Sequence, residues 1–320
     1  MNIGLAQLVD ERALPHLEAT REFNAARRAA GGQRGPASYD ELLAARESLP
    51  SGPAGGHASE HIARASGREV PVRVTGPSSG RPRAAYLDVH GGGFYLDSAA
   101  RYDARNARLA DELGVAVVSV EYRLAPEHPW PAAPDDCETA ALWLVEEGQA
   151  RFGTTRILIG GASAGATLAT ATLLRMRDRG LVRSVVGAVL QYGAYDLSGS
   201  SPGGRLYADE WFIEAYAGHV PDRTHPDVSP LWGDLRGLPP ILMLVGTLDV
   251  LLEDNLAMGA RLSAAGVEVD LRVYPEAMHG FAGHPTPVAA AALEAIEAWL
   301  AERLREGPES PGGRRSRPRP

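Results

Sequence analysis

The chain has 320 residues, a formal net charge of −8 and 44% hydrophobic residues, a composition typical of a globular protein with one large domain and a small accessory unit. Every basic residue is arginine, and without a basic stripe the acidic chain is not expected to bind nucleic acid. The longest apolar run, near residues 241–245, is too short to cross a bilayer, and Asp10, Glu11 and Arg12 come too early for a secretory signal, so membrane insertion is not expected.

Residues 1–55 are predicted to form a helical segment of their own, with a capping box at residues 38–41 and a glycine- and proline-rich break at 51–56. Strands and helices then alternate to the end of the chain. Apolar runs predict strands at 70–74, 84–89, 115–120, 156–160, 185–190, 241–245 and 267–273, and runs that mostly stop at glycine predict helices at 99–113, 132–147, 164–179, 251–265 and 287–305.

This alternation predicts an α/β fold, with a mostly parallel central sheet covered by helices on both faces. Residues 197–228 interrupt the pattern, because they are rich in glycine and proline and then aromatic, and they are predicted to be an insertion over the edge of the sheet. Residues 307–320 have the composition of a disordered tail, although contact with an acidic partner is an alternative.

Cys137 is the one cysteine, so the chain can form no internal disulfide, and we expect a reducing compartment, the cytoplasm. It lies in an apolar helical stretch. That position favours a small buried residue over a second nucleophile.

The strongest motif is Gly161-Ala162-Ser163-Ala164-Gly165, placed between a predicted strand and a predicted helix. In that context G-x-S-x-G is typical of a nucleophile elbow, in which a sharp turn exposes the serine and small neighbours avoid a clash. The alternative is a glycine-rich start of a helix, which could also bind phosphate.

A second motif, His90-Gly91-Gly92-Gly93-Phe94, directly follows the predicted strand at 84–89. Consecutive glycines let backbone N–H groups approach a ligand, and such a loop can stabilise the oxyanion of a tetrahedral intermediate. We expect the N–H groups of Gly91, Gly92 and Ala164 to form this oxyanion hole; the alternative is a flexible turn.

The acid and the base should follow Ser163 in chain order, each after a strand. Asp249 follows the strand at 241–245, and His279 follows the strand at 267–273. A carboxylate that orients an imidazole, which in turn takes the proton of a serine hydroxyl, is the arrangement that activates serine. The rivals that we weigh are Glu253 and Asp254 for the acid, and His284, His128, His219 and His225 for the base.

Ligand-binding motifs for cofactors are not found. His219 and His225 have no convincing third metal ligand, and no dinucleotide or P-loop motif follows a strand, so we expect neither a metal nor a cofactor.

With these motifs in place, the chain resembles the hormone-sensitive-lipase-like (family IV) bacterial esterases of the α/β-hydrolase fold. The matching segments share their order and spacing with that family over about residues 60–305. They are His90–Phe94, Tyr122-Arg123-Leu124-Ala125-Pro126-Glu127-His128-Pro129 with Pro131-Ala132-Ala133, Gly161–Gly165, Gly246-Thr247-Leu248-Asp249 and His279-Gly280-Phe281.

The resemblance implies hydrolysis of small carboxylic esters with short to medium acyl groups, through an acyl-enzyme and without a cofactor. It also implies a helical cap built from residues 1–55 and an insertion at about 197–228, over a catalytic domain at 56–306. The small-molecule ester would be the main partner, and a homodimer is possible. The substrate pocket is expected to be lined by aromatic residues: Phe94, Tyr95, Tyr192, Trp211, Phe212 and Tyr216.

Four positions depart from the family pattern. Ala162 stands in place of Asp, Ala166 in place of Gly, Val250 in place of Pro, and Asp97-Ser98 in place of a Gly-Ser pair. None of them removes a catalytic group, so they bear on the substrate more than on the mechanism.

Two other functions remain open. The same triad could serve as a deacetylase or lactonase of a natural product, or hydrolyse an amide, because specificity depends on contacts in the cap. The same fold could also be a non-catalytic small-molecule receptor, although such receptors characteristically lose a member of the triad.

Overall fold

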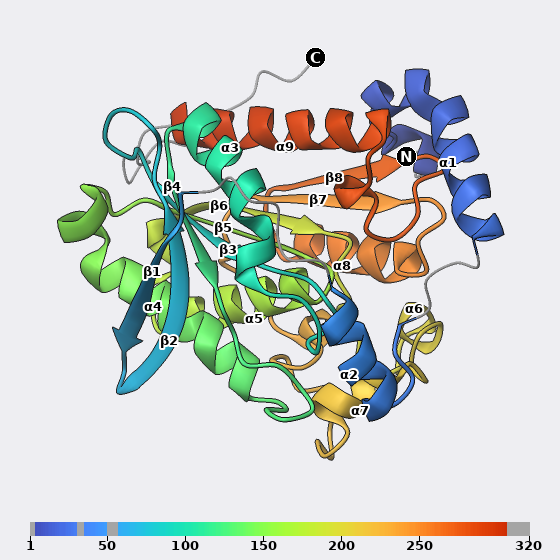
Figure 1. Cartoon of the computed structure of the whole chain (residues 1–320), viewed down its shortest axis with the longest axis horizontal. Helices are drawn as coiled ribbons and strands as arrows, with labels where there is room; N and C mark the ends of the chain where they lie inside the picture. Colours follow the sequence, from blue (N-terminus) through green and yellow to red (C-terminus); the bar gives the residue numbers. More distant parts are fainter. Residues whose placement is uncertain (1–3, 31–34, 50–56, 306–320) are drawn as a thin grey trace.

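The computed structural model describes residues 4–30, 35–49 and 57–305, so the predicted break at 51–56 and the predicted tail at 307–320 lie outside the described residues. The described part is built on an eight-stranded sheet in the order β1-β2-β4-β3-β5-β6-β7-β8 (Figure 1). β2 pairs antiparallel with β1 and β4, and the other neighbours pair parallel. The strands are β1 Ser59–Ala65, β2 Arg68–Thr75, β3 Ala85–Val89, β4 Ala116–Val120, β5 Ile157–Ala162, β6 Val185–Gln191, β7 Ile241–Gly246 and β8 Val269–Tyr274.

Helices follow most of the strands, as the alternation predicts. The α-helices are α1 Leu17–Ala29, α2 Tyr39–Ser48, α3 Asp103–Leu113, α4 Ala132–Phe152, α5 Ala164–Asp178, α6 Pro202–Arg205, α7 Trp211–Ala217, α8 Leu252–Ala264 and α9 Pro287–Arg305. Short 3₁₀ turns connect them: η1 Leu5–Gln7, η2 Glu11–His16, η3 Ala99–Tyr102, η4 Val182–Ser184, η5 Pro230–Trp232 and η6 Phe281–Gly283. The predicted α/β fold with a mostly parallel sheet is confirmed.

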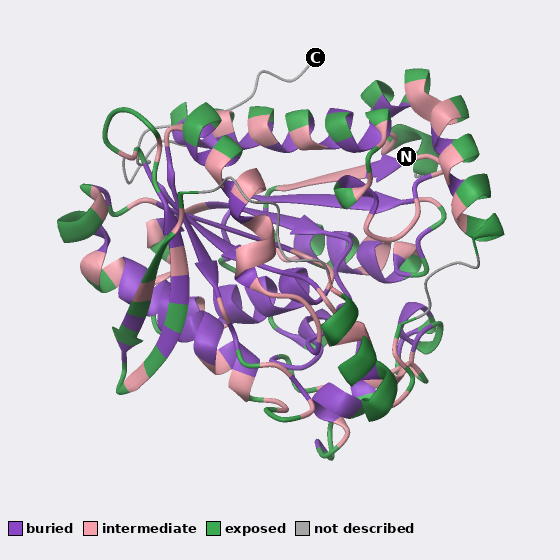
Figure 2. Ribbon diagram, in the orientation of Figure 1, coloured by how far each residue is buried: buried purple, intermediate pink, exposed green. Residues whose placement is uncertain are grey.

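The sheet is covered on both faces. Side chains of α4, α5 and α8 pack in the core on one face, and those of α3 and α9 pack on the other. β3, β4 and β7 are buried along their whole length, and Figure 2 shows the central strands as the buried centre of the molecule. Continuous apolar runs are what a parallel strand needs when helices lie on both of its sides.

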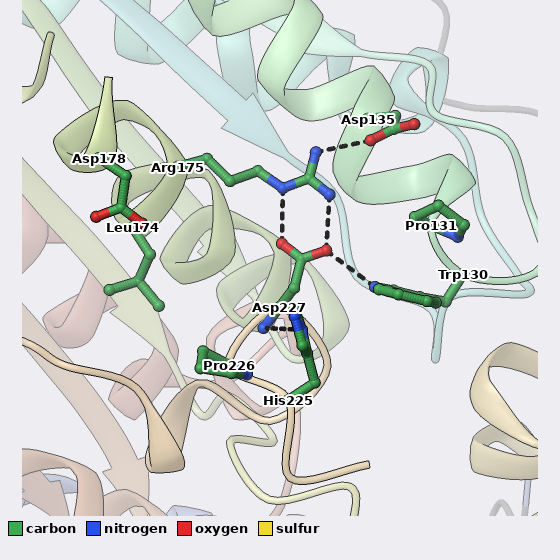
Figure 3. A pocket seen from close by; sticks show the side chains of 9 residues that line it. All are labelled: Trp130, Pro131, Asp135, Leu174, Arg175, Asp178, His225, Pro226 and Asp227. Carbon is green, nitrogen blue, oxygen red and sulfur yellow. Dashed lines mark hydrogen bonds and ion pairs between the residues drawn. The ribbon is translucent and has the colours of Figure 1, made fainter. Parts of the chain in front are cut away.

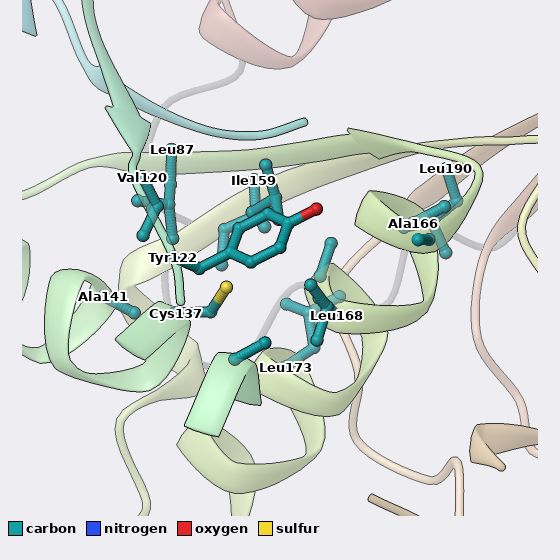
Figure 4. Close-up of a cluster of buried hydrophobic side chains, with 14 of the residues drawn as sticks. Leu87, Val120, Tyr122, Cys137, Ala141, Ile159, Ala166, Leu168, Leu173 and Leu190 are labelled. Carbon is teal, nitrogen blue, oxygen red and sulfur yellow. The ribbon is translucent and has the colours of Figure 1, made fainter. Parts of the chain in front are cut away.

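Cys137 lies in the core between α4 and the sheet, beside Tyr122, Ile159 and Leu168 (Figure 4). Burial raises the pKa of its thiol well above the ordinary value. The residue is therefore a small apolar component of the core, as expected, and has no thiolate to act as a nucleophile.

One helix continues beyond its predicted end. The sequence places the end of the helix at Gly148, whereas α4 runs on to Phe152 and ends at Gly153, whose φ of 73° is left-handed. Gly148 serves another purpose, because a Cβ there would lie 3.0 Å from the carbonyl oxygen of Thr154. The glycine allows the chain to return closely past the helix.

The sequence does not predict β1, because this edge strand carries polar residues among its apolar ones and shows no apolar run. A hairpin signal was available in the sequence. Ser66 and Gly67 form a two-residue connection, both with positive φ, between the paired residues Ala65 and Arg68. A serine-glycine pair between two short strands is typical of this tight turn.

The helices of the N-terminal segment lie in two places (Figure 1). α1 packs against α9 beside β8, whereas α2 lies with α7 on the opposite side of the C-terminal strands. Both α2 and α7 contact Tyr95, α2 through Arg46 and α7 through Trp211. Within residues 4–30, 35–49 and 57–305, no helix combines the length and the apolar character needed to cross a membrane.

Candidate active site

Ser163 lies in the sharp turn between β5 and α5, with φ 55° and ψ −123°. This conformation is unfavourable for a residue with a side chain, and it needs support from its surroundings. The Ser163 N–H donates to Gln191 O at 2.9 Å, while Ser163 O accepts from the N–H of Ala166 at 2.9 Å. The turn therefore fixes the serine at the carboxyl edge of the sheet.

The two glycines of the motif are required by close backbone contacts. A Cβ at Gly161 would run into the backbone of Gly165, and a Cβ at Gly165 would run into the carbonyl oxygens of Val89 and His90. α5 therefore packs directly against the end of β3. This contact brings Ser163 next to the loop that begins at His90.

The predicted acid and base come together beside the serine. Ser163 Oγ lies 2.9 Å from His279 Nε2, and His279 Nδ1 lies 2.9 Å and 3.1 Å from the two carboxylate oxygens of Asp249. A neutral imidazole that donates its Nδ1–H to Asp249 has an unprotonated Nε2, which can accept the serine proton. The Asp249 carboxylate is fully buried and also accepts the N–H of Leu251 at 2.9 Å.

The loops that carry the acid and the base are joined through their backbones. Thr247 N–H donates to Tyr274 O and Leu248 N–H donates to Ala277 O, each at 3.0 Å. A Cβ at Gly246 would run into the Ala277 carbonyl, so the glycine at the end of β7 allows this approach.

The main rival residues have other partners. Asp254 accepts hydrogen bonds from Tyr207 Oη at 2.8 Å and from the N–H of Tyr195 at 2.5 Å, and burial raises the pKa of its carboxyl to about 6. His284 Nε2 lies 2.5 Å from an Arg27 nitrogen, and burial lowers the pKa of the imidazole to about 4. The structure thus groups Asp249 and His279, and not Asp254 and His284, with Ser163.

The predicted oxyanion loop lies against the serine. The position of a Cβ on Gly91 is 3.6 Å from Ser163 Cβ, and Gly92 has a φ of 102°, which glycine adopts readily. The Gly92 carbonyl accepts the N–H of Leu96 at 2.8 Å and closes a turn. Ala164 is the first residue of α5, where backbone N–H groups have no acceptor inside the helix.

Comparison with known proteins agrees with this geometry. A family model described as alpha/beta hydrolase fold matches residues 86–283. The chain belongs to the α/β-hydrolase family. The match includes Ser163, Asp249 and His279.

Individual relatives extend the likeness. The chain is 34% identical over 229 residues to an ethyl acetate hydrolase from Pseudomonas putida, covering 67% of this chain and 72% of the relative. The crystal structure of a hormone-sensitive lipase from a metagenome library is 30% identical, with a TM-score of 0.73, covering 89% of this chain and 98% of that one. The structure of an esterase from the archaeon Pyrobaculum calidifontis is 32% identical, with a TM-score of 0.71, and the match covers 78% of this chain and 86% of that one. The resemblance to hormone-sensitive-lipase-like esterases is confirmed.

In this α/β hydrolase, Tyr122 and His90 brace the predicted oxyanion loop through contacts that the sequence does not predict. Tyr122 Oη donates to the carbonyl oxygens of His90 and Gly91, each at 3.0 Å, and its ring stacks on His90 at 4.1 Å. His90 Nδ1 lies 2.8 Å from Gly91 O, and burial lowers the pKa of the imidazole, which keeps it neutral. Tyr122 belongs to the Tyr-Arg-Leu-Ala-Pro-Glu motif, so a signal was visible in the sequence.

Arg46 of α2 is a second residue that the sequence did not reveal. Its guanidinium donates to Tyr95 O at 3.0 Å, to Ala125 O at 2.8 Å and to the Glu127 carboxylate at 2.6 Å. It therefore ties α2 to Tyr95, directly after the predicted oxyanion loop, and to the loop after β4. An arginine in an exposed helix carries no sign of such contacts.

The six aromatic residues predicted to line a pocket do not form one group. Five of them pack together where the chain after β3 meets α7: Phe94, Tyr95, Trp211, Phe212 and Tyr216, with Phe94 stacked on Tyr216 at 4.0 Å. Tyr192 lies apart, with its ring 5.2 Å from the His279 ring and edge-on to it. Phe94 and Tyr216 are completely buried, whereas Trp211 and Phe212 are partly exposed.

A hollow lies elsewhere, between α4, α5 and the segment before η5 (Figure 3). Arg175 pairs with Asp227 and Asp135 in its wall. None of the triad residues lines the hollow, whose lining is Trp130, Pro131, Asp135, Leu174, Arg175, Asp178, His225, Pro226 and Asp227. The predicted chemistry, and not the shape of this hollow, therefore identifies the candidate site. Among the described residues, no three His, Cys, Asp or Glu side chains are grouped as metal ligands.

Proposed function

We propose that this α/β hydrolase hydrolyses carboxylic esters through a Ser163–His279–Asp249 triad and an acyl-enzyme. The observation that carries the proposal is the unbroken series of short contacts from Ser163 Oγ to His279 and from His279 to the buried Asp249. A serine hydroxyl is a weak nucleophile, and a neutral imidazole within hydrogen-bond distance is the group that activates it.

In the first half of the reaction, Ser163 Oγ attacks the ester carbonyl while His279 Nε2 takes its proton. Asp249 holds the imidazole in the tautomer with Nδ1–H and stabilises the imidazolium that forms. The N–H groups of Gly91, Gly92 and Ala164 stabilise the negative oxygen of the tetrahedral intermediate. His279 then donates its proton to the alcohol oxygen, the ester C–O bond breaks, and the acyl-enzyme remains.

In the second half, water attacks the acyl-enzyme. His279 takes a proton from the water as general base, a second oxyanion forms in the same hole, and Ser163 Oγ leaves with the proton from His279. The products are a carboxylic acid and the free enzyme. The cycle requires no cofactor.

Small esters with short acyl groups are the proposed substrates. Phe212 packs close to the oxyanion loop, because a Cβ on Gly93 would lie 3.4 Å from Phe212 Cβ. Of the expected cap, residues 1–55 and 197–228, we propose that α2, α6 and α7 cover the site, whereas α1 packs against α9. The aromatic group around Phe94 and Phe212 would then limit acyl length. The relative that is named an ethyl acetate hydrolase supports the same substrate class.

The test is a series of p-nitrophenyl esters from acetate to dodecanoate, hydrolysed by the wild-type protein and by Ser163→Ala. We expect turnover of the short esters and a loss of kcat of about 10⁶-fold in the variant. Binding of the esters by the wild-type protein with no turnover would instead indicate a receptor. Turnover of lactones or anilides with none of esters would move the proposal to another acyl chemistry on the same triad.

A further inference from the structure

The loop that carries His279 contains an unfavourable backbone conformation three residues before the histidine. We call residues 275–280, between β8 and η6, the base loop. Within it Glu276 has a φ of 61°, in the left-handed region that glycine adopts freely and other residues adopt at a cost. Without support, the loop would relax toward another conformation and carry His279 away from Ser163.

Three side chains hold Glu276 in place. Thr247, from the loop of the acid, accepts the Glu276 N–H on its Oγ1 at 2.8 Å. Asn24 of α1 donates its Nδ2–H to the Glu276 carbonyl oxygen at 2.6 Å. Arg21 of α1 pairs with the Glu276 carboxylate at 3.0 Å. Two of the three contacts therefore come from a helix at the other end of the chain, 252 and 255 residues away in sequence.

The contact from Asn24 is the stronger of the two from α1. Arg21 is 63% exposed, and ion pairs at the surface contribute little because water screens them and both side chains lose freedom. Asn24 is only 3% exposed, so its loss would remove a largely shielded hydrogen bond and leave the Glu276 carbonyl without this partner. Asn24 also bonds to the backbone, so it acts on the conformation itself.

The N-terminal elements contact the chain on both sides of His279. Before the histidine, Tyr274 Oη donates to Asp10 at 3.0 Å, and Asn24 holds Glu276. After it, His284 contacts Arg27 and the ring of Phe23, 5.0 Å away. Figure 1 shows α1 beside the end of β8 where this loop begins.

We propose that Asn24 is a positioning residue for the general base: by holding the Glu276 carbonyl it keeps the base loop in the conformation that presents His279 to Ser163. The proposal rests on the triad proposed above. A displacement of about 1 Å at a reacting group can reduce the rate about 100-fold, so the hydrogen bond from Asn24 to Glu276 contributes to catalysis as well as to stability.

The first test compares Asn24→Leu with the wild-type protein. Leucine has a similar shape but no donor, so we expect kcat for p-nitrophenyl acetate to fall about 10- to 100-fold while KM changes less than about twofold. Asn24→Ala is measured as well, so that a poor fit of leucine is not taken for the loss of the donor. Thermal unfolding curves ensure that all rates are measured on folded protein.

Thr20→Val is the matched control. Thr20 lies one turn before Asn24 on α1, is equally buried, and donates its Oγ1–H to the carbonyl oxygen of His16, the residue before α1, at 2.7 Å. Its loss weakens α1 without touching the base loop. If Thr20→Val lowers kcat as much as Asn24→Leu does, α1 acts only through stability and the proposal is overturned.

The second test uses Glu276→Gly, because glycine adopts a positive φ without cost and the loop then no longer depends on Asn24. In the Glu276→Gly background, we expect Asn24→Leu to lower kcat less than about twofold. If Asn24→Leu lowers kcat equally in the wild-type and Glu276→Gly backgrounds, the proposal is overturned.

Failure of this proposal and failure of the proposed function give different results. If the wild-type protein shows no turnover, or if Ser163→Ala keeps it, the triad is wrong. If Ser163→Ala abolishes turnover and Asn24→Leu matches the wild-type protein in kcat, the triad stands and only the role of Asn24 is wrong.

Discussion

At the scale of single residues, non-glycine positions with positive φ gather in the loops of the site, at Phe94, Ser163, Tyr192 and Glu276. Each such conformation costs about 1–3 kcal/mol, so each persists only because its neighbours hold it. Hydrogen bonds to β6 and to the start of α5 stabilise the conformation of Ser163. Hydrogen bonds to Thr247 and to α1 stabilise that of Glu276.

Asp254 provides a prediction at this scale. Burial raises the pKa of its carboxyl from 3.8 to about 6, so the folded state favours the protonated acid. The stability from this group is full below pH 3.8 and is lost as pH rises through about 6. In Asp254→Asn an amide oxygen can accept the same N–H and O–H groups without ionising, so we expect the variant to be more stable than the wild-type protein by about 3 kcal/mol at about pH 8.

Urea unfolding at about pH 4 and about pH 8 measures this effect. The advantage of Asp254→Asn should shrink toward the lower pH, and ester turnover should remain, because Asp254 lies outside the triad. An advantage of the same size at both pH values would show that ionisation of Asp254 is not its cause.

Only residues whose conformation requires a visible pattern of neighbours could be predicted from the sequence. Ser163 is found because its turn requires Gly161 and Gly165, and glycines at fixed spacing are visible. Glu276 and Asn24 could not be found in this way. A positive φ at glutamate leaves no mark in the sequence, and the partner of Asn24 is set only when α1 packs against the base loop.

At the scale of elements, α2 and α7 contact Tyr95, beside the loop that begins at His90. Strand-helix alternation predicts the sheet, because apolar runs in parallel strands follow from burial on both faces. The same reasoning does not predict where α1 and α2 lie, since an amphipathic helix can cover any apolar surface. Nor does it predict β1, because an edge strand can carry polar residues on its open side.

Arg46 gives the prediction at this scale. Arg46→Met keeps the aliphatic stem but removes the donors to Tyr95 O and Ala125 O, so the oxyanion loop loses its link to α2. We expect kcat/KM for p-nitrophenyl acetate to fall about tenfold, a partial loss compared with the roughly 10²- to 10³-fold effect of removing an oxyanion donor.

Arg46→Lys is the control for charge. Lysine can still pair with Glu127 but cannot reach two carbonyl oxygens with a rigid fork, so we expect an intermediate loss. The surface-accessible pair with Glu127 contributes little alone. Wild-type kinetics in Arg46→Met would mean that the oxyanion loop holds its shape without α2.

At the scale of the whole molecule, Arg175 joins three parts of the fold on the side of the sheet covered by α4 and α5 (Figure 3). It pairs with both carboxylate oxygens of Asp227, at 2.6 Å and 2.7 Å, and with Asp135 of α4 at 2.7 Å. Trp130 Nε1 donates to the same Asp227 at 2.9 Å. The segment before η5 is thereby fastened to two helices.

Arg175→Met should separate stability from chemistry. Removing the cation leaves the buried Asp227 carboxylate without its counter-charge, whereas Asp135 keeps its pair with Arg68. We expect a loss of about 3 kcal/mol in the free energy of unfolding. At about 20 °C, kcat/KM should stay within about twofold, because the network contains no triad residue. Replacing Asp227 by Leu in the same variant should recover part of the stability, and no recovery would argue against a charge effect.

The backbone hydrogen bonds between the loops of Asp249 and His279 have a consequence for motion in the folded state. These bonds join the loop of Asp249 directly to the loop of His279, whereas Ser163 lies in a separate turn between β5 and α5. Thermal motion should therefore change the distance between the His279 imidazole and the Asp249 carboxylate little, and change mainly the distance from His279 Nε2 to Ser163 Oγ. Across a set of liganded crystal forms, we expect the scatter in the Ser163–His279 separation to exceed that in the His279–Asp249 separation.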